Sequence, residues 1–310
     1  MKVRFISPDG PIGNPTSGKG RFMQRMTTVF QEHGIEPVYD LTTPTDIDFH
    51  ISKFHYGTNL CKKRILRMGP AQIDTNKDIR YLNRKKKYAI KRVDGVIYQS
   101  EFAQNMCNAM LGPAVCPTEV IFNGAIPWDG PPARSPHKIN FFTSARKWTK
   151  QKRLFNVLEA FMAAAVPDSA MFVVGNIMKA HRITGRNIYY TGLIDDAKLF
   201  AMHKLCHAMV HIVWLDACPN GVVEALVNGC PVITNNWGGT HELGVQTVIP
   251  DTPWNFKPVN LDKTPKLDVN LLAEAMKKHA AERVAINASH LHIDNITKQY
   301  ANFFKRILHG

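Results

Sequence analysis

Short apolar runs alternate with helix-like stretches along nearly the whole chain, and this alternation restarts after one proline-rich interruption. In the first half, the pattern predicts strands at 3–6, 36–39, 48–51, 95–98 and 119–122, with a helix at 19–33. Residues 128–138 hold three prolines and a glycine, which resist both helix and strand and therefore indicate a boundary. Since strand–helix–strand units build parallel sheets covered on both faces, we expect an α/β protein.

The second half repeats the alternation. Strands are predicted at 139–143, 171–174, 188–190, 210–213 and 232–234, helices at 152–165, 196–206 and 221–228, and a helical tail within 267–308. The expected architecture is two Rossmann-like α/β domains facing a cleft. We place the first domain at 1–130, the second at 131–292, and a final helix at 293–310 that packs back on the first domain.

Composition excludes several protein classes. The 310 residues are 45% hydrophobic and 21% charged, as in globular proteins and unlike disordered or fibrous chains. No apolar stretch reaches the roughly 18 residues needed to span a membrane, and the segment MKVRFISPDG resembles a buried strand more than a signal peptide. The net charge of +14 indicates a polyanionic partner: nucleic acid, an anionic membrane or phosphorylated small molecules.

Neither cysteines nor histidines form a convincing metal site. Six cysteines lie far apart, so we expect reduced thiols rather than a zinc site or redox pair. His203, His207 and His211 are spaced for one helix face, but His211 falls within a predicted strand, and no carboxylate joins them. The sequence therefore predicts no metal site.

A glycine-rich loop at 13–20 nearly matches a phosphate-binding P-loop. It begins at Gly13 and continues to Gly18 and Lys19, but Gly20 stands where a magnesium-binding Ser or Thr is needed. Two interpretations stay open: backbone N–H groups that meet a phosphate or sugar at a helix N-terminus, or a tight turn without a ligand.

Two further segments follow predicted strands, where open α/β sheets bind ligands. The first contains Asp216, then Asn220 and Gly221 at the start of a helix that carries Glu224 in its first turn, then a turn at Gly238. Its helix N-terminus offers N–H donors to a phosphate, and Glu224 can accept hydrogen bonds from a ribose diol. The second segment, 145–153, carries five cations, and its position at a strand end indicates that some of them grip a diphosphate rather than form a solvated face.

These segments resemble the GT-B glycosyltransferases of the retaining family 4 (group 1) type. Asp216 and Glu224 resemble the E-x7-E signature, with Asp in the first place. GCPVIT (229–234), GGTHEL (238–243) and GRNIYYTGLID (185–195) resemble further elements of that family, as do VDGVIYQSEFAQ (93–104) and VIFNGA (120–125) in the first half.

The resemblance implies a donor-binding second domain and an acceptor-side first domain. It implies that Arg146 and Lys152 hold the donor diphosphate, with Lys147 or Lys150 as substitutes, that Glu224 binds ribose, and that Asp216 contacts the sugar. A first-domain histidine, His55 or alternatively His50, would touch the sugar. The remaining donor-binding residues implied are Gly13, Gly192, Leu193, Asn220, Gly221, Val222, Gly239 and Glu242.

The implied chemistry is a retaining transfer from a UDP-sugar or GDP-sugar, in which the departing diphosphate acts as the base for the acceptor hydroxyl. Fixed cations would stabilise the charge on the leaving phosphate, so no metal or other cofactor is expected. No obligate protein partner is evident, and the expected location is the cytoplasm (host cytoplasm for a viral protein), including a peripheral place at the membrane.

The acceptor is a separate question, and the charge bears on it. Residues 62–92 hold twelve cations and two acids, a net charge of +10. The predicted polyanion surface consists of Lys62, Lys63, Arg64, Arg84, Lys85, Lys86, Lys87 and Lys91.

Two interpretations of this surface compete. It can track a phosphate backbone while a hydroxylated DNA base is glycosylated, as compact viral and phage enzymes do, or it can lie on anionic lipid headgroups next to a lipid-linked or cell-envelope glycan. We favour DNA slightly, because the segment lacks Trp and Phe; a soluble acceptor is a third possibility. A non-enzymatic alternative, a degenerate transferase that only binds nucleotide or nucleic acid, would show no hydrolysis of nucleotide-sugars.

Overall fold

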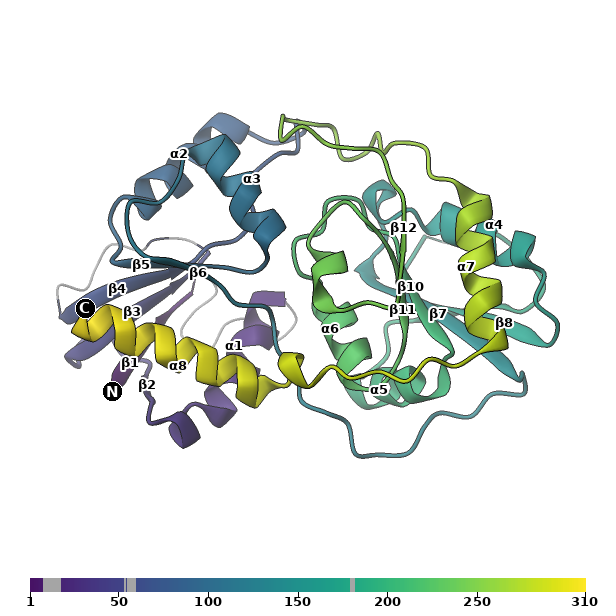
Figure 1. Cartoon of the computed structure of the whole chain (residues 1–310), viewed down its shortest axis with the longest axis horizontal. Coiled ribbons are helices and arrows are strands. Elements are labelled where there is room, and N and C mark those ends of the chain that lie inside the picture. The colour runs from purple at the N-terminus through teal and green to yellow at the C-terminus, as the bar shows by residue number, and fades with distance from the viewer. Residues whose placement is uncertain (8–17, 53, 55–59, 179–181) are drawn as a thin grey trace. The chain divides into compact units, whose positions relative to one another are not determined.

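A computed structural model describes residues 1–7, 18–52, 54, 60–178 and 182–310 (Figure 1). The chain divides into two compact units. Unit 1 comprises Met1–Ile126, Phe256–Val259 and His290–Gly310, and unit 2 comprises Pro127–Asn255 and Asn260–Ser289. Each unit is built around a six-stranded sheet.

The sheet of unit 1 has the strand order β2-β1-β3-β4-β5-β6, and all its neighbouring strands are parallel. Its strands are β1 (Lys2–Ile6), β2 (Glu36–Val38), β3 (Thr45–Ile51), β4 (Cys61–Arg67), β5 (Gly95–Tyr98) and β6 (Thr118–Val120). Its helices are α1 (Gly18–Val29), η1 (Gln31–His33), α2 (Ile79–Ile90), α3 (Glu101–Leu111) and α8 (Ile293–His309), the last preceded by η5 (Ser289–Leu291).

Helices cover both faces of this sheet: α1 and α8 lie on one side, and α2 and α3 on the other (Figure 1). The apolar side chains of α8 recur at helical spacing, and this face packs on the sheet, with Tyr300, Phe303 and Phe304 fully buried. A Cβ atom at Gly95 would come 3.0 Å from the Phe303 ring, so this glycine lets α8 approach β5 closely.

One charged pair is buried in the sheet of unit 1. Arg4 on β1 and Asp48 on β3 are opposite each other in the parallel register, and their side chains are fully buried. The guanidinium lies 3.5 Å from the carboxylate and also donates to the Thr43 carbonyl, while Thr45 donates to Asp48 at 3.0 Å. These contacts compensate for the burial of two charges.

The sheet of unit 2 has the order β12-β11-β10-β7-β8-β9 and is parallel throughout. Its strands are β7 (Ile139–Lys147), β8 (Ser169–Asn176), β9 (Ile188–Gly192), β10 (Ala208–His211), β11 (Val232–Asn235) and β12 (Thr247–Ile249). Its helices are η2 (Lys150–Lys152), α4 (Leu154–Ala164), α5 (Asp196–Leu205), α6 (Asn220–Val227), η4 (Thr240–Leu243) and α7 (Val269–Ala281).

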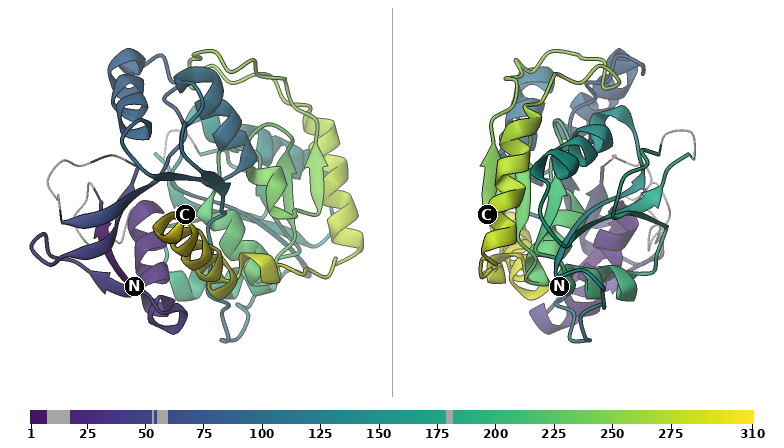
Figure 2. Two further views of the ribbon diagram at one scale, coloured as in Figure 1. Left: turned by 60° about the vertical axis from the view of Figure 1, so that its left-hand side comes forward. Right: turned by 90° about the vertical axis from the view of Figure 1, so that its right-hand side faces the viewer.

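The core of unit 2 lies between its sheet and helices α4 and α7. These two helices lie side by side (Figure 2). Helices α5 and α6 contact each other and lie on the other side of the sheet (Figure 1). The strands are near-continuous apolar runs, such as the buried Phe141 and Phe142 of β7, which is typical of a sheet covered on both faces.

The α/β prediction is confirmed, and several element bounds are corrected. The strand predicted at 95–98 is β5 itself, whereas the helix predicted at 19–33 ends at Val29, and the strand predicted at 210–213 ends at His211. Strand β4 and helix α3 were not predicted. Within the described residues, no helix is both long and apolar enough to cross a membrane.

Candidate active site

The chain order of the strands in unit 2 creates a switch point between β7 and β10. The chain passes from β7 to β8 and β9 on one side, then returns to β10, β11 and β12 on the other. Ligands in open parallel sheets bind beyond the carboxyl ends of the strands at such a point. Most of the predicted donor-binding residues follow strands at this edge of the sheet.

Arg146 lies near the carboxyl end of β7, which extends to Lys147 rather than ending at 143 as predicted. Its side chain is exposed. The neighbouring strand β8 approaches this end closely, because Gly175 has φ 114° and a Cβ there would lie 1.6 Å from the Ala145 carbonyl oxygen. Gly175 therefore fixes the strand end that presents Arg146.

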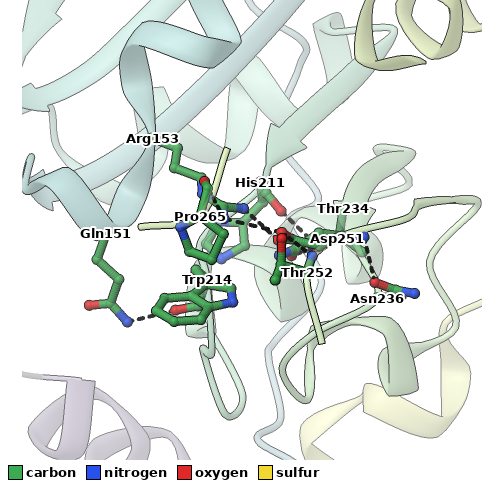
Figure 3. A network of polar contacts seen from close by, with 10 residues as sticks. Gln151, Arg153, His211, Trp214, Thr234, Asn236, Asp251, Thr252 and Pro265 are labelled. Carbon is green, nitrogen blue, oxygen red and sulfur yellow. Dashed lines mark hydrogen bonds and ion pairs between the residues drawn. The ribbon is translucent and has the colours of Figure 1, made fainter. Parts of the chain in front are cut away.

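Lys152 lies in the short helix η2, which is fastened to the loop after β10. The Gln151 amide donates to the Trp214 carbonyl at 2.7 Å, and the Trp214 N–H donates to the Gln151 carbonyl at 3.2 Å (Figure 3). Lys152 Nζ donates to the Lys147 carbonyl at 2.9 Å. Burial lowers the pKa of Lys152, and the nearby Asp216 carboxylate partly opposes this shift. Two of the predicted catalytic residues are thus electrostatic neighbours.

Arg153 belongs to a different environment from the other cations of segment 145–153. Its guanidinium makes a fully buried bidentate ion pair with Asp251, at 2.5 and 3.1 Å, and donates to the Pro265 carbonyl at 3.1 Å (Figure 3). Asn235 also donates to Asp251, at 2.5 Å. Arg153, which was not among the cations predicted to hold the diphosphate, is therefore a structural anchor.

The backbone of Asp216 is held by the turn after β11. The Gly239 N–H donates to the Asp216 carbonyl at 2.7 Å, and the preceding Leu215, in the left-handed region at φ 60°, donates to Trp237 at 3.2 Å. Gly238 has φ 134°, and a Cβ there would lie 2.6 Å from the Asp216 carbonyl oxygen. The Gly238-Gly239 turn therefore serves to place Asp216, and Glu242 follows in η4, partly exposed.

The Asp216 side chain is about one-third exposed, and its Oδ2 lies 3.6 Å from Nε2 of His211. His211 is the last residue of β10 and is buried. From the sequence, His211 was considered only as a metal ligand. Its place at a strand end, five residues before Asp216, was the available signal.

Helix α6 starts next to β7. The position of a Cβ at Gly221 lies 3.5 Å from Ser144 Oγ, so the first turn of α6 packs beside the carboxyl half of β7. Pro219 precedes Asn220 and caps the helix without a side-chain hydrogen bond. The N–H groups in the first turn of a helix have no partners within the helix and favour anions.

Glu224 is the fifth residue of α6, so its predicted place in the first turn is corrected to the second turn. It is buried, at 1% exposure. Val222, also buried, precedes it by two residues. Helix α6 thus presents backbone N–H groups at its start and a carboxylate one turn deeper.

Gly192 and Leu193 lie at the carboxyl end of β9. Gly192 has φ 69°, a conformation that favours glycine, and Leu193 is 55% exposed. An exposed leucine at this edge of the sheet offers an apolar surface to a flat ring.

In unit 1, Gly13 and His55 lie outside the described residues. The alternative histidine, His50, is buried on β3 and stacks on Phe54 with ring centroids 4.8 Å apart. Of the two histidines proposed to touch the sugar, the structure therefore describes only the alternative, His50.

The predicted polyanion surface comprises two different elements rather than one. Lys62, Lys63 and Arg64 belong to strand β4, where Lys62 pairs with Asp46 at 2.7 Å and Lys63 with Asp94 at 3.9 Å. The other predicted cations belong to α2 or directly follow it: Arg84, Lys85, Lys86, Lys87 and Lys91. Lys86 donates to the Gly69 carbonyl at 3.4 Å and to that of Pro70, whereas the other four are exposed.

Within the described ranges, no three His, Cys, Asp or Glu side chains are grouped so that they could hold a metal ion. His203 lies on α5 and His211 on β10, so these histidines do not share one helix face. This agrees with the prediction that His211 falls within a strand.

The fold is shared with solved glycosyltransferase structures. No protein-family model and no curated protein matches the chain. Anabaena Alr3699/HepE in complex with UDP matches with a TM-score of 0.62 at 15% identity, over 99% of this chain and 100% of HepE. AviGT4, a glycosyltransferase involved in avilamycin A biosynthesis, matches with a TM-score of 0.65 at 13% identity, over 100% and 98%.

A glycosyltransferase from Rickettsia africae ESF-5 matches with a TM-score of 0.59 at 12% identity, over 100% of this chain and 98% of that one. All three likenesses extend over both units rather than over one of them. With its two parallel six-stranded sheets, the chain has the GT-B fold of these glycosyltransferases.

Proposed function

We propose that this protein is a retaining glycosyltransferase that moves a sugar from a UDP-sugar or GDP-sugar to a hydroxyl acceptor. One observation carries the proposal: Lys152, Asp216 and the start of α6 come together at the switch point of unit 2. The HepE structures, which hold UDP, UDP and glucose, or UDP-glucose, support a nucleotide-sugar as donor.

The residues at this edge of the sheet fit the parts of such a donor. Arg146 and Lys152 supply positive charge for the diphosphate, and the N–H groups of Asn220 and Gly221 add donors. The N–H of Val222 already donates to the Pro219 carbonyl at 3.1 Å, so Val222 contributes position rather than a donor. Asp216 faces the sugar. We assign Glu224, one turn into α6, to the ribose diol.

The base, at the far end of the donor, meets the carboxyl end of β9. Gly192 leaves room for it, and the exposed Leu193 side chain packs on its flat face. The turn of Gly239 and Glu242 completes the set on the side of the sugar.

The transfer breaks the bond between the anomeric carbon and the diphosphate oxygen. That oxygen gains negative charge as it leaves and takes the proton of the acceptor hydroxyl, whose oxygen forms the new bond on the same face of the sugar. Preorganised cations and helix N–H groups lower the energy of this charge, and one such donor is worth about 100- to 1,000-fold in rate. The half-buried Lys152 is suited to this role, because charges interact more strongly where water is partly excluded.

The test is turnover of a panel of nucleotide-sugars, with product configuration read by NMR. Lys152→Ala and Glu224→Ala should each lower kcat/KM about 100-fold or more. Lys198→Ala, which removes an exposed cation of α5 that pairs with Asp195, is the matched control and should retain full activity. Full activity in Lys152→Ala, or a product of inverted configuration, would overturn the assignment. Binding of a nucleotide-sugar without any hydrolysis or transfer would favour the non-enzymatic alternative.

For the acceptor, we propose a polyanion that meets the exposed face of α2, with DNA carrying a hydroxylated base as the first candidate. Arg84, Lys85 and Lys87 are exposed there. Two tyrosines join the cations: Lys85 Nζ lies 4.2 Å from the centre of the Tyr81 ring, and the Arg92 guanidinium lies 3.4 Å from that of Tyr88. A face of cations and aromatic rings suits phosphates and unstacked bases.

The same helix gives less support to a membrane acceptor. A helix that lies in a lipid surface exposes large aliphatic or aromatic side chains beside its cations. In α2, Ala89 and Ile90 are buried, Ile79 and Leu82 are half-buried, and Tyr81 is the exposed large apolar residue of this helix.

The acceptor test compares hydroxymethylated DNA with vesicles of anionic lipid. The variant Lys85→Glu/Lys87→Glu should weaken DNA binding. It should also reduce the slope of log binding constant against log salt concentration by about 0.9 for each lost phosphate contact. Lys277→Glu/Lys278→Glu on α7 is the control of equal charge change in unit 2. Binding to vesicles, with neither binding nor a mass shift on DNA, would favour the glycan acceptor.

A further inference from the structure

His211 is a buried histidine whose ring is aimed at the Asp216 carboxylate. It is 7% exposed, and Nε2 lies 3.6 Å from Asp216 Oδ2. Its backbone is fixed by the next strand, because Thr234 Oγ1 donates to the His211 carbonyl at 2.7 Å and the two residues are partners in the β10–β11 register. The ring therefore projects from a rigid part of the sheet, whereas Asp216 lies in a loop.

The Nε2 atom of His211 has no hydrogen-bond partner among the described residues. A buried polar atom that lacks a partner destabilises the fold, so the nearest acceptor is favoured as its partner. The separation from Asp216 is within ion-pair range and just beyond hydrogen-bond length. The carboxylate is thus the acceptor within reach, and closing this gap would form a charge-assisted hydrogen bond.

Asp216 also has a cation nearby. Lys152 is close enough that the Asp216 charge raises its pKa against the effect of burial. If Asp216 turned fully toward Lys152, it would neutralise the ammonium that the donor diphosphate needs. The backbone of Asp216 cannot adjust, since Gly239 and the close approach of Gly238 hold it. The direction of this short side chain therefore depends on what it contacts at its tip.

We propose that His211 is a positioning residue: its Nε2 proton holds the Asp216 carboxylate at the end of β10, toward the donor sugar, and leaves Lys152 available to the diphosphate. The inference rests on the proposed function for its catalytic consequence, but the contact itself does not. Neither the resemblance nor the spacing of the histidines assigns this role to His211.

The kinetic test uses His211→Leu, which removes the proton, and His211→Gln, which keeps an N–H donor at the position of Nε2. His211→Leu should lower kcat about tenfold or more and raise the Kd for free UDP or GDP by about threefold or more, because the released Asp216 carboxylate turns toward Lys152 and competes with the diphosphate. His211→Gln should recover most of kcat. The control is His279→Leu, which removes a buried histidine of α7. Its Nε2 lies 2.9 Å from Thr247 Oγ1 of β12, two strands away from β10 at the edge of the sheet.

A double-mutant cycle with Asp216→Asn separates positioning from general damage. If His211 acts through Asp216, His211→Leu should add little to the loss already caused by Asp216→Asn. Three results would each overturn the proposal. The first is that the kcat losses of the two single variants multiply in the double variant, and the second is that His211→Gln is no more active than His211→Leu at equal thermal stability. The third is that His211→Leu keeps a kcat within twofold of the wild type.

The contact can also be tested without any turnover. In imidazole NMR spectra at fixed pH, Asp216→Asn should shift the ring resonances of His211, assigned by their loss in His211→Gln, and leave those of His279 unchanged. If this shift is present but no nucleotide-sugar is turned over, the proposed function fails and the contact stands. If the His211 resonances do not move, the positioning role is wrong whatever the enzyme transfers.

Discussion

Lys152 is the residue whose surroundings most directly affect the proposed chemistry. Burial favours its neutral form and lowers its pKa, while the Asp216 carboxylate favours the ammonium. Only the ammonium can hold a diphosphate, so activity should fall as pH rises through the pKa of Lys152.

Asp216→Asn should move this alkaline limb to lower pH. The substitution removes the charge that supports the ammonium, so the pKa of Lys152 falls further. The measurement is kcat/KM against pH, with Glu274→Gln, an exposed carboxylate of α7, as control. An alkaline limb that stays in place, or moves to higher pH, would contradict the electrostatic link between the two residues.

His203 gives a prediction about stability rather than activity. Burial lowers its pKa from 6.5 to about 3, so below pH 6.5 the unfolded chain takes up a proton that the folded chain excludes. The free energy of unfolding should therefore decrease by up to about 1.4 kcal/mol per pH unit as the pH falls below 6.5.

The variant His203→Leu tests this contribution. It should make the loss of stability between pH 7 and pH 5 smaller by about 2 kcal/mol in urea titrations, because a leucine takes up no proton. His290→Leu, at an exposed position, should leave the pH dependence as in the wild type. Equal slopes in wild type and His203→Leu would show that His203 is protonated in the folded protein.

Neighbouring cations show how far sequence alone can predict a site. Lys152 and Arg153 are adjacent, and the spacing in the sequence gives no reason to separate them. Their environments differ because Arg153, at φ 50°, turns its side chain inward to Asp251, almost a hundred residues later. The paired acids Asp216 and Glu224 were recognisable from their spacing, whereas the contact between His211 and Asp216 depends on a loop conformation that no spacing records.

At the scale of elements, long apolar runs were predictable and cationic ones were not. Strand β5 is four consecutive buried residues, so its bounds follow from the sequence. In strand β4, Lys62 and Lys63 follow the first residue, Cys61, and this pattern resembles a solvated basic segment. It is nevertheless a strand of the sheet, because its neighbours β3 and β5 pair with it on both sides and its final residues are buried.

Helix α8 should contribute much of the stability of unit 1. Phe304 is fully buried and lies edge-on to Phe49 of β3, with ring centroids 5.2 Å apart. Phe304→Ala should lower the free energy of unfolding by about 3–5 kcal/mol, the usual cost of a buried phenylalanine. The measurement is denaturation followed by far-UV circular dichroism, with the exposed Asn302→Ala as control. A loss below about 1 kcal/mol would mean that α8 is not part of the core.

At the scale of the whole molecule, the two units differ in charge and in their aromatic residues. Unit 1 contains 22 Lys and Arg against 12 Asp and Glu, so its net charge of +10 equals that of residues 62–92 alone. All five tryptophans, Trp128, Trp148, Trp214, Trp237 and Trp254, belong to unit 2. The excess charge therefore marks the unit assigned to the acceptor, and tryptophan fluorescence reports only on the unit assigned to the donor.

This division makes donor binding measurable in the intact chain. A nucleotide that binds folded unit 2 stabilises it by about 2.7 kcal/mol at a hundred times its Kd. UDP or GDP should therefore raise the midpoint of unfolding detected by tryptophan fluorescence, and the larger shift identifies the preferred base. Lys152→Ala should reduce this shift strongly, whereas Lys198→Ala should preserve it, because only Lys152 lies beside Asp216 at the switch point. A midpoint that neither nucleotide moves at millimolar concentration would argue against a nucleotide-sugar donor, because the proposed donor site lies in unit 2 and the tryptophans report the unfolding of that unit.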